Sequence, residues 1–235
     1  MTWSETLSAD QRLEPGESLR TRVGRTLSLA IISGELAPGT LLTVPTLAER
    51  FAISATPVRE AILDLEKRGF VEPVRNKGFR VTAVSDELLQ DIVEIRLLLE
   101  PPAMARLAAS FPQERLEAFR AQADAIVTGA RSGDLTAYLL ADQRFHLELT
   151  ALLGNPVLVE TIADLRERTR LVGLVSMVET SMLHVSAEEH HRLLDHLAAN
   201  DADAAADLMR QHIRHATGWW AGKAEEPAIE TGTSE

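Results

Sequence analysis

The sequence contains no cysteine, and only 4% of its 235 residues are aromatic. Without cysteine the chain has no disulfide scaffold, Cys-ligated zinc finger, iron–sulfur cluster or cysteine nucleophile, so any metal must be held by His, Asp or Glu. No stretch approaches the roughly 18 consecutive apolar residues that a membrane-spanning helix needs. The N-terminus also lacks a basic segment followed by an apolar run. We therefore expect a soluble, cytoplasmic protein with no membrane partner.

Positive charge is scarce in most of the chain, which has a formal net charge of −11. Residues 19–84 are the exception, because they contain ten Lys/Arg and only six Asp/Glu. Residues 85–235 contain thirteen Lys/Arg and twenty-five Asp/Glu. The length and the 45% hydrophobic content suffice for two domains with apolar cores. A basic module can neutralise nucleic-acid phosphates, and an acidic body limits indiscriminate binding. This pattern predicts a small DNA-binding domain followed by a larger acidic domain.

The basic segment, residues 19–84, has the pattern of a winged helix-turn-helix. It follows residues 1–18, a polar arm that we expect to be mobile. Apolar residues recur at helical spacing in three stretches: residues 19–33, 45–51 and about 56–68. Two β-type runs with a basic connection then predict a hairpin: residues 70–72 and 79–82. In this architecture the third helix enters the major groove and the hairpin, or wing, reaches the DNA backbone or minor groove.

From Ser85 to residue 221 the pattern is helical throughout. Ser85 can cap the first helix, and Pro101-Pro102 should bend it. Five further helices are expected over these ranges: about 112–131, 134–153, 156–178, 181–199 and 201–221. Short connections between them favour an antiparallel six-helix bundle, followed by a disordered tail at 222–235. The predicted fold class is therefore mainly α.

The third helix of the winged domain can present Arg59 to DNA. With Val58, Ile62 and Leu65 turned inward, Arg59 lies on another face near the helix N-terminus, where recognition helices reach base edges. An ion pair with a nearby carboxylate is the alternative for Arg59, and a solvated basic loop is the alternative for the wing. Thr56 or Ser54 can cap the third helix. The candidate DNA-contacting residues are Thr56, Arg59, Arg75, Lys77, Gly78 and Arg80.

Four groups on three predicted helices point into the bundle and form a candidate metal site. Asp142 and His146 are i and i+4, so they share one helix face. His190 and His212 each lie on an apolar stripe, whereas His191 is turned about 100° away from His190. One carboxylate and three imidazoles suit Zn²⁺, with Ni²⁺, Mn²⁺ or Fe²⁺ possible. The alternative for any one of these histidines is a hydrogen-bonded core residue.

The metal is expected to bind a ligand rather than to catalyse a reaction. No general base has motif support, since Glu148 lies two residues past His146 and points elsewhere. The more economical role is to hold an acidic metabolite, with Arg96 or Arg170 pairing with its carboxylate. For both arginines the alternative is a structural salt bridge.

The winged domain contains four recognisable motifs: Gly34-Glu-Leu-Ala-Pro-Gly-Thr, Leu47-Ala-Glu-Arg-Phe, Ile53-Ser-Ala-Thr-Pro-Val-Arg-Glu-Ala-Ile and Leu65-Glu-Lys-Arg-Gly-Phe-Val. Together they strongly resemble the DNA-binding domain of the GntR family of bacterial transcription regulators. The helical remainder resembles the FadR-type (FCD) effector domain, through Glu94-Ile-Arg-Leu-Leu-Leu-Glu-Pro and Asp142-Gln-Arg-Phe-His. The resemblance includes the family's metal site, with the same separation between His190 and His212. Family members usually have Glu-Arg at Val44-Pro45 and Arg at Ala55, so the operator preference of this chain is expected to differ.

The resulting expectation is a metabolite-responsive transcription regulator that contains a metal and acts as a homodimer on a near-palindromic double-stranded operator. A small carboxylate on the metal would signal through Arg96 and the first bundle helix to Ser85 at the domain junction. Two alternatives are a metal-dependent hydrolase or lyase with an accessory DNA-binding domain, and a regulator whose metal is purely structural.

Overall fold

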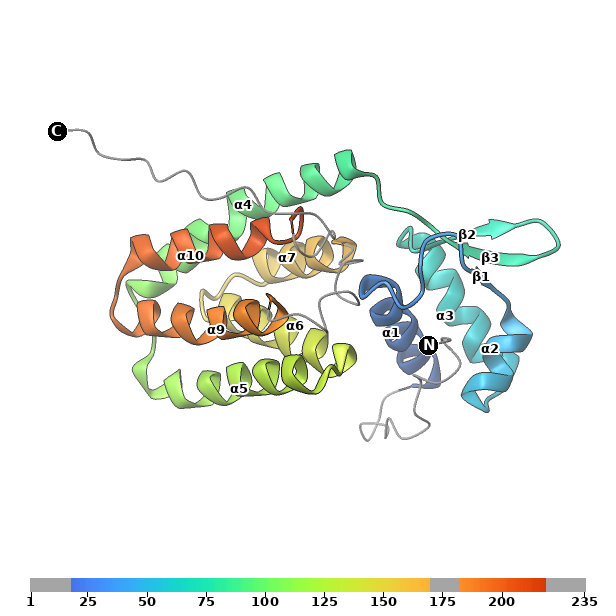
Figure 1. Cartoon of the computed structure of the whole chain (residues 1–235), viewed down its shortest axis with the longest axis horizontal. Helices are drawn as coiled ribbons and strands as arrows, with labels where there is room; N and C mark the ends of the chain where they lie inside the picture. The colour runs from blue at the N-terminus through green and yellow to red at the C-terminus, as the bar shows by residue number, and fades with distance from the viewer. Residues whose placement is uncertain (1–17, 170–181, 219–235) are drawn as a thin grey trace.

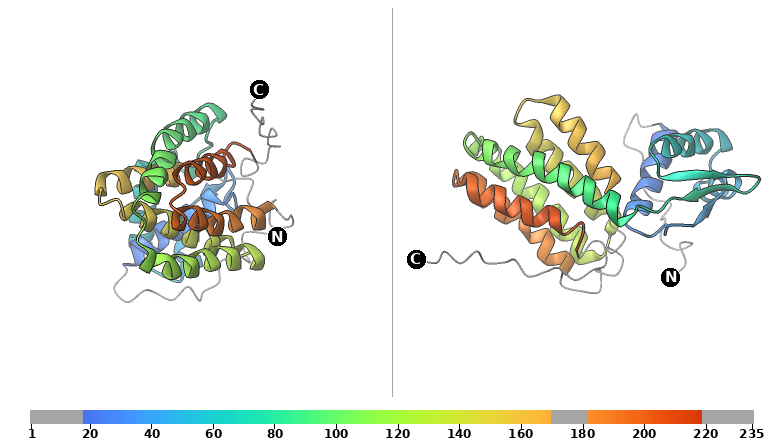
Figure 2. Two further views of the ribbon diagram at one scale, coloured as in Figure 1. Left: turned by 90° about the vertical axis from the view of Figure 1, so that its left-hand side faces the viewer. Right: turned by 90° about the horizontal axis from the view of Figure 1, so that it is seen from above.

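The computed structural model describes residues 18–169 and 182–218 (Figure 1). Residues 1–17 of the expected arm, the expected C-terminal tail and Arg170 lie outside these residues, whereas Ser18, the last residue of that arm, is the N-cap of helix α1 (Leu19–Ile32). The chain forms a small mixed domain and a larger helical domain, placed next to each other along the longest axis of the molecule (Figures 1 and 2). In the described part of the chain, no helix combines the length and the apolar character needed to cross a bilayer.

The small domain is a winged helix-turn-helix. Its elements are α1 (Leu19–Ile32), β1 (Leu41–Leu42), α2 (Val44–Phe51), α3 (Ala55–Lys67), β2 (Val71–Val74) and β3 (Gly78–Val81). The antiparallel sheet has the order β1-β3-β2, with Leu41 opposite Arg80 and Val71 opposite Val81. The predicted helices and hairpin are confirmed within a few residues. Strand β1 was not predicted, because two residues are too few to show an alternating pattern.

Local sequence explains where α2 and α3 begin. The Thr43 side chain accepts a hydrogen bond from the backbone N–H of Thr46 and caps α2, and Pro45 lies in its first turn. Ser54 occupies the N-cap position of α3, but its side chain makes no capping hydrogen bond. Of the two caps that the sequence allowed for α3, Ser54 is therefore at the capping position, whereas Thr56 lies inside the helix.

Gly78 begins β3 and lies very close to β1. Its φ of 116° lies in the region that side-chain-bearing residues rarely adopt. A Cβ atom at this position would be 2.3 Å from the carbonyl oxygen of Leu42. The sheet itself therefore requires glycine here, whether or not the wing touches DNA.

The larger domain contains six α-helices within the described residues. They are α4 (Asp86–Ala108), α5 (Leu116–Ser132), α6 (Leu135–Ala151), α7 (Pro156–Arg168), α9 (Met182–Ala198) and α10 (Ala202–Arg214), with a 3-10 turn, η1 (Gln113–Arg115), before α5. Helix α10 packs along α4, and α5 packs against both α6 and α9. Phe119 and Phe145 meet edge to face in the core, with ring centroids 6.0 Å apart.

The boundaries of the helical domain differ from expectation in two places. Helix α7 ends at Arg168 and α10 ends at Arg214, whereas helices to residues 178 and 221 were expected. Residues 170–178 and 219–221 of those expected ranges lie outside the described residues. Ser85 does cap α4, accepting from the backbone N–H of Leu88 at 3.1 Å. Helix α4 then continues through Pro101 and Pro102 to Ala108, although each proline removes a backbone donor.

The two domains contact each other directly. Helix α1 of the winged domain packs against α6 and α7 of the helical domain. Arg68, the C-cap residue of α3, forms an ion pair with Glu167 of α7. The recognition helix is therefore joined to the helical domain by side chains as well as by the connection through Ser85.

Candidate metal centre and nucleic-acid interface

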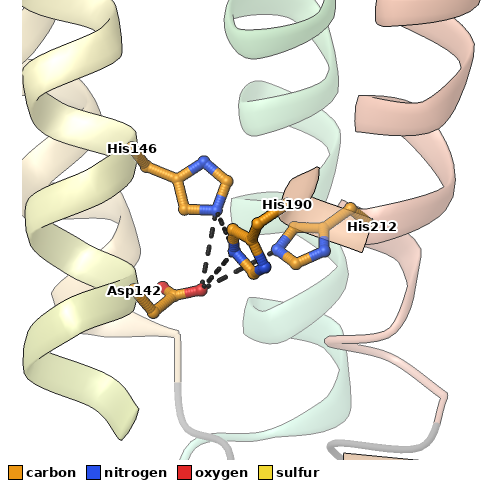
Figure 3. A group of neighbouring side chains, drawn as sticks. All are labelled: Asp142, His146, His190 and His212. Atoms are coloured by element: carbon orange, nitrogen blue, oxygen red, sulfur yellow. Dashed lines mark hydrogen bonds and ion pairs between the residues drawn. The ribbon is translucent and has the colours of Figure 1, made fainter. Parts of the chain in front are cut away.

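Asp142, His146, His190 and His212 converge in the helical domain (Figure 3). Helix α6 supplies the first two, one turn apart, and α9 and α10 supply one histidine each. One ligand atom from each residue lies within 4.8 Å of the others. The three imidazoles are at most 4% exposed and the Asp142 side chain is 13% exposed. The structure therefore brings together the four predicted ligands.

Hydrogen bonds on the outer side of the cluster orient two of the imidazole rings. His190 Nδ1 lies 2.9 Å from the carbonyl oxygen of Ala187, and His212 Nδ1 lies 2.8 Å from Glu189 Oε2. Carbonyl and carboxylate oxygens only accept, so both Nδ1 atoms carry the hydrogen. A ring that carries its hydrogen on Nδ1 alone directs the lone pair of Nε2 toward the other ligands.

This arrangement of acceptors fits a divalent cation. His190 Nε2 lies 3.2 Å from Asp142 Oδ1 and 3.1 Å from His146 Nε2. Burial lowers the pKa of His146 well below its usual range and that of His212 to about 4, so both rings are neutral near pH 7. Lone pairs and a carboxylate facing one another repel unless a proton or a cation lies between them. The donor set of three nitrogens and one oxygen is one that Zn²⁺ and similar ions accept.

Arg166 of α7 holds the only carboxylate of this cluster. Its Nη2 donates to Asp142 Oδ2 at 2.7 Å and its Nη1 donates to Glu100 Oε2 at 2.8 Å. Burial would raise the pKa of Asp142, but the Arg166 guanidinium and His146 hold it well below its usual range. Sequence reasoning missed Arg166. The available signal was its position on the same face of α7 as the buried residues Ile162 and Leu165.

Arg96 lies beside this ion-pair network and is 2% exposed. Its Nε donates to Glu100 Oε1 at 2.6 Å and its Nη1 to Thr169 Oγ1 at 3.4 Å. The structural salt bridge considered for Arg96 is therefore present. Its Nη2 is buried and has no hydrogen-bond partner within the described residues, so pairing with a ligand carboxylate stays a prediction. Arg170 lies outside the described residues.

Glu189 is a second residue beside the cluster that was not predicted from the sequence. Besides His212, it accepts a hydrogen bond from His215 Nε2, at 3.0 Å from Oε1, and its side chain is 2% exposed. Burial would raise the pKa of Glu189, but these two histidines lower it to about 2. The signal in the sequence was an acidic residue among the buried, mostly apolar positions of α9, which indicates a buried partner for a histidine. His191, by contrast, pairs with Asp124 at 3.1 Å, outside the cluster.

The candidate DNA-contacting residues lie on α3 and on the wing. Arg59 is exposed in the first half of α3, while Val58 and Ile62 are fully buried. No ion pair to Arg59 is present in the described part of the chain, so the carboxylate-pairing alternative is not observed there. Thr56 is also exposed. Both side chains are therefore accessible on the helix expected to enter the major groove.

The wing presents its basic residues at the end of the molecule remote from the helical domain (Figure 1). Arg75 and Lys77 are exposed in the turn between β2 and β3, next to Gly78. Arg80 lies on β3 and is 3.5 Å from Glu72, with both side chains about half exposed. The ion pair of Arg80 with Glu72 is weak at this exposure, so Arg80 is also accessible to phosphate.

Comparison with known families gives a match for each domain. Residues 19–81 match "Bacterial regulatory proteins, gntR family", and residues 91–215 match the "FCD domain". The chain belongs to the GntR family. It is a DNA-binding transcription regulator with an FCD domain, and the FCD match includes all four residues of the His/Asp cluster. This confirms the family and the fold class expected from the sequence.

The relatives are also regulators. The transcriptional repressor GlaR of Escherichia coli is 29% identical over 197 residues, covering 80% of this chain and 90% of GlaR. The Nta operon transcriptional regulator of Aminobacter aminovorans is 28% identical over 185 residues, which cover 78% of this chain and 85% of that regulator. The solved structure of E. coli McbR/YncC aligns with a TM-score of 0.74 and 26% identity over 88% of this chain and 98% of that one. The regulator class is thus confirmed over the hydrolase or lyase alternative.

Proposed function

We propose that this regulator changes its operator affinity when a small carboxylate binds at a divalent metal in the FCD domain. One observation carries the proposal: Asp142 and three buried imidazoles converge beside a cavity that Arg96 and Arg166 also line. A carboxylate suits both the metal and the arginines. The effector-binding residues we propose are Arg96 and Arg166, together with Arg170 from the sequence analysis.

The metal would be held by Asp142, His146, His190 and His212. Zn²⁺ is the ion best suited to this set, and Ni²⁺, Mn²⁺ and Fe²⁺ also accept it. When bound, the ion supplies a positive charge and an open coordination position to a ligand carboxylate. Glu189 and the Ala187 carbonyl would keep the rings of His212 and His190 oriented toward it.

Operator binding is assigned to the exposed residues of α3 and the wing. Arg59 would contact base edges, since arginine pairs bidentately with guanine in the major groove, and Thr56 would lie nearby. Arg75, Lys77 and Arg80 would neutralise phosphates, with the Gly78 backbone close to the DNA. Val44-Pro45 and Ala55 stand where relatives usually have DNA-contacting residues, so we propose an operator preference particular to this chain.

We also propose that the protein acts as a homodimer on a near-palindromic operator. An exposed apolar stripe on α4 supports this. Leu88 is 40% exposed, Ile95 45% and Leu98 68%, and their spacing places them on one side of the helix. A second copy of the chain would cover this stripe. The same helix leads to the DNA-binding domain, so dimer contacts there would set the distance between two recognition helices.

Operator titration of the full chain tests the proposed function. The operator is first selected from a random-sequence DNA pool. Its Kd is then measured for the metal-free protein, the zinc-loaded protein and the zinc-loaded protein with C3 to C6 mono-, di- and hydroxycarboxylic acids. We expect at least one acid to change the Kd by about 5- to 150-fold, and only when zinc is present. If chelation unfolds the FCD domain and no acid changes the Kd, the metal is structural and the proposal fails.

A further inference from the structure

A cavity of about 550 Å³ lies between the two domains. Helices α1 and α3 of the winged domain form one wall, and α4, α6 and α7 of the FCD domain form the other. The cavity reaches Asp142 of the His/Asp cluster, as well as Arg96 and Arg166. This volume is in the range of sites that enclose small molecules. A ligand that approaches Asp142 through this cavity must touch the DNA-binding domain.

The charges on the cavity walls favour an anion. Five arginines and three carboxylates line the cavity among the described residues: Arg20, Arg25, Arg68, Arg96 and Arg166, with Asp64, Asp142 and Glu167. Glu100 pairs with both Arg96 and Arg166, so one positive charge remains in excess, whereas the whole chain has a net charge of −11. A positively charged concave surface on an acidic protein concentrates small anions.

Each wall also contributes a buried polar atom without a hydrogen-bond partner in the described ranges. These atoms are Ser28 Oγ on α1 and Arg96 Nη2 on α4, and the two residues are 7% and 2% exposed. An unsatisfied buried polar group typically costs about 1–3 kcal/mol. Leu29 and Leu139 add apolar surface, one from each wall. A small acid with an apolar body and a second polar group matches these walls.

Gly24 shows that α1 leaves space where a side chain would fit. It lies in the interior of α1, where glycine costs about 0.5–1 kcal/mol relative to alanine. A Cβ atom there would meet only the Cβ of Ala61, at 3.9 Å, which is an ordinary contact. Close packing therefore does not require glycine at this position. Gly24 lines the cavity, and the missing side chain enlarges it.

We propose that this inter-domain cavity is a shared ligand site for a small organic acid. The carboxylate faces Arg96 and Arg166, and the apolar body lies against α1 and α3. This deepens the proposed function and rests on it, because it assigns half of the effector site to the DNA-binding domain. A bound acid then acts directly on the position of α3, since Ala61, Asp64 and Leu65 of this helix line the same cavity.

The absence of cysteine makes the test specific. Gly24→Cys places a single thiol on the cavity wall, and Ala121→Cys places one at an exposed position of α5, outside the cavity. The full-length variants are alkylated with iodoacetate or with its neutral isostere iodoacetamide. We expect the rate ratio of iodoacetate to iodoacetamide to be about tenfold higher for Gly24→Cys than for Ala121→Cys. Thr21→Cys, at an exposed position on the same wall, repeats the measurement if Gly24→Cys does not fold.

Equal ratios at the cavity and control positions overturn the shared site, whatever the outcome of the operator titration. A raised ratio supports the shared site with or without zinc, because the arginines alone supply the positive charge, and the operator titration tests the metal-bound carboxylate separately. The alkylated Gly24→Cys proteins give a second measurement. We expect the carboxymethylated and carbamidomethylated forms to differ at least fivefold in operator Kd, and equal values would overturn the direct action on α3.

Discussion

Arg166 Nη2 donates to Asp142 Oδ2 at 2.7 Å, so a residue of α7 fixes the carboxylate of the candidate metal centre on α6. The same guanidinium reaches Glu100 on α4, which also pairs with Arg96. Three helices are thereby connected through buried charges. Because each buried charge depends on the others for compensation, losing one member of the network affects both the fold and the metal site.

We expect Arg166→Met to lower the free energy of unfolding by about 3–5 kcal/mol, because it leaves Asp142 and Glu100 with too little positive charge around them. Denaturant unfolding of the metal-free protein measures this. Arg168→Met on the same helix is the matched control: Arg168 is 46% exposed and 3.7 Å from Asp164. The free energy of unfolding of Arg168→Met should stay within about 0.5 kcal/mol of that of the unchanged chain. Similar losses in the two variants would contradict the role assigned to Arg166.

Metal content should fall in His190→Ala and in His212→Ala but not in His191→Ala. His190 and His212 point into the cluster, whereas His191 contacts Asp124. Elemental analysis of the purified proteins after equilibration with zinc measures the content. Glu189→Gln should retain the metal with about 10- to 100-fold weaker affinity, since it weakens the partner that orients His212. Loss of metal from His191→Ala as well would show that the assigned ligand set is wrong.

The metal-free protein should lose stability as the pH falls from about 6.5 to 4. Burial lowers the pKa of His212 from 6.5 to about 4, so the unfolded chain binds more protons than the folded one within this window. The stabilisation is complete above pH 6.5 and is lost as the pH falls toward 4. At 1.36 kcal/mol per pKa unit, the loss from His212 is on the order of 3 kcal/mol.

Thermal unfolding of the metal-free protein at pH 7 and at pH 4.5 measures this loss. His191→Gln is the control, because this side chain is 23% exposed and lies outside the cluster, and its pH profile should match that of the unchanged chain. Equal melting temperatures at the two pH values would show that His212 is not buried in its neutral form.

The sequence was most informative where a residue's role depends on helical periodicity. Asp142 and His146 are one turn apart, and His190 and His191 differ by one step of rotation, so their relative directions follow from helix geometry alone. The resemblance to the family then indicated that the helices carrying Asp142, His190 and His212 lie next to one another. The sequence could therefore predict the winged domain, the bundle and all four members of the cluster.

The remaining features depend on contacts between elements far apart in the chain. Arg166 meets Asp142 because α7 packs on α6, and the cavity exists because α1 packs against α6 and α7. A residue's periodicity shows which face it occupies but not which helix it will meet. Strand β1 is defined by its pairing with β3, so its two residues carried no independent signal.

Arg59→Ala should weaken binding to the selected operator by about 1–3 kcal/mol and leave nonspecific DNA binding nearly unchanged, because it removes a base-edge contact from an exposed position. Fluorescence titrations with operator and scrambled duplexes measure both affinities. Lys67→Ala at the far end of α3 is the control, because Lys67 is 77% exposed and lies away from the helix N-terminus. Equal losses of affinity for both duplexes would make Arg59 a phosphate contact.

Lys77→Ala on the wing should affect specific and nonspecific DNA binding alike, in contrast to Arg59→Ala. It should weaken binding to both duplexes equally and reduce the number of phosphate contacts by about one, as measured by the slope of log K against log salt. An unchanged slope would remove the wing from the DNA interface.

The effector response has two possible routes to the recognition helices. One passes from Arg96 along α4 to Ser85, as the sequence suggested. The other is direct, because Arg166 contacts Asp142 and its neighbour Glu167 pairs with Arg68 at the end of α3. We expect the direct route to dominate, because the cavity and the Arg68–Glu167 ion pair lie at the same contact between the domains.

Glu167→Gln distinguishes these routes, because it removes the charged partner of Arg68 without changing Arg68 itself. It should preserve metal content and the operator Kd of the metal-free protein, but reduce the acid-dependent change in Kd by at least about threefold, within the usual range of allosteric coupling energies. Asp164→Asn is the matched control, since Asp164 is 62% exposed on the same helix and pairs only with Arg168 among the described residues. A full response in Glu167→Gln would show that the Arg68–Glu167 contact does not transmit the signal, and would assign the response to the route along α4 instead. An effector can act only through an element whose position differs between the DNA-bound and DNA-free states, so a variant that still binds the acid but loses the response identifies that element.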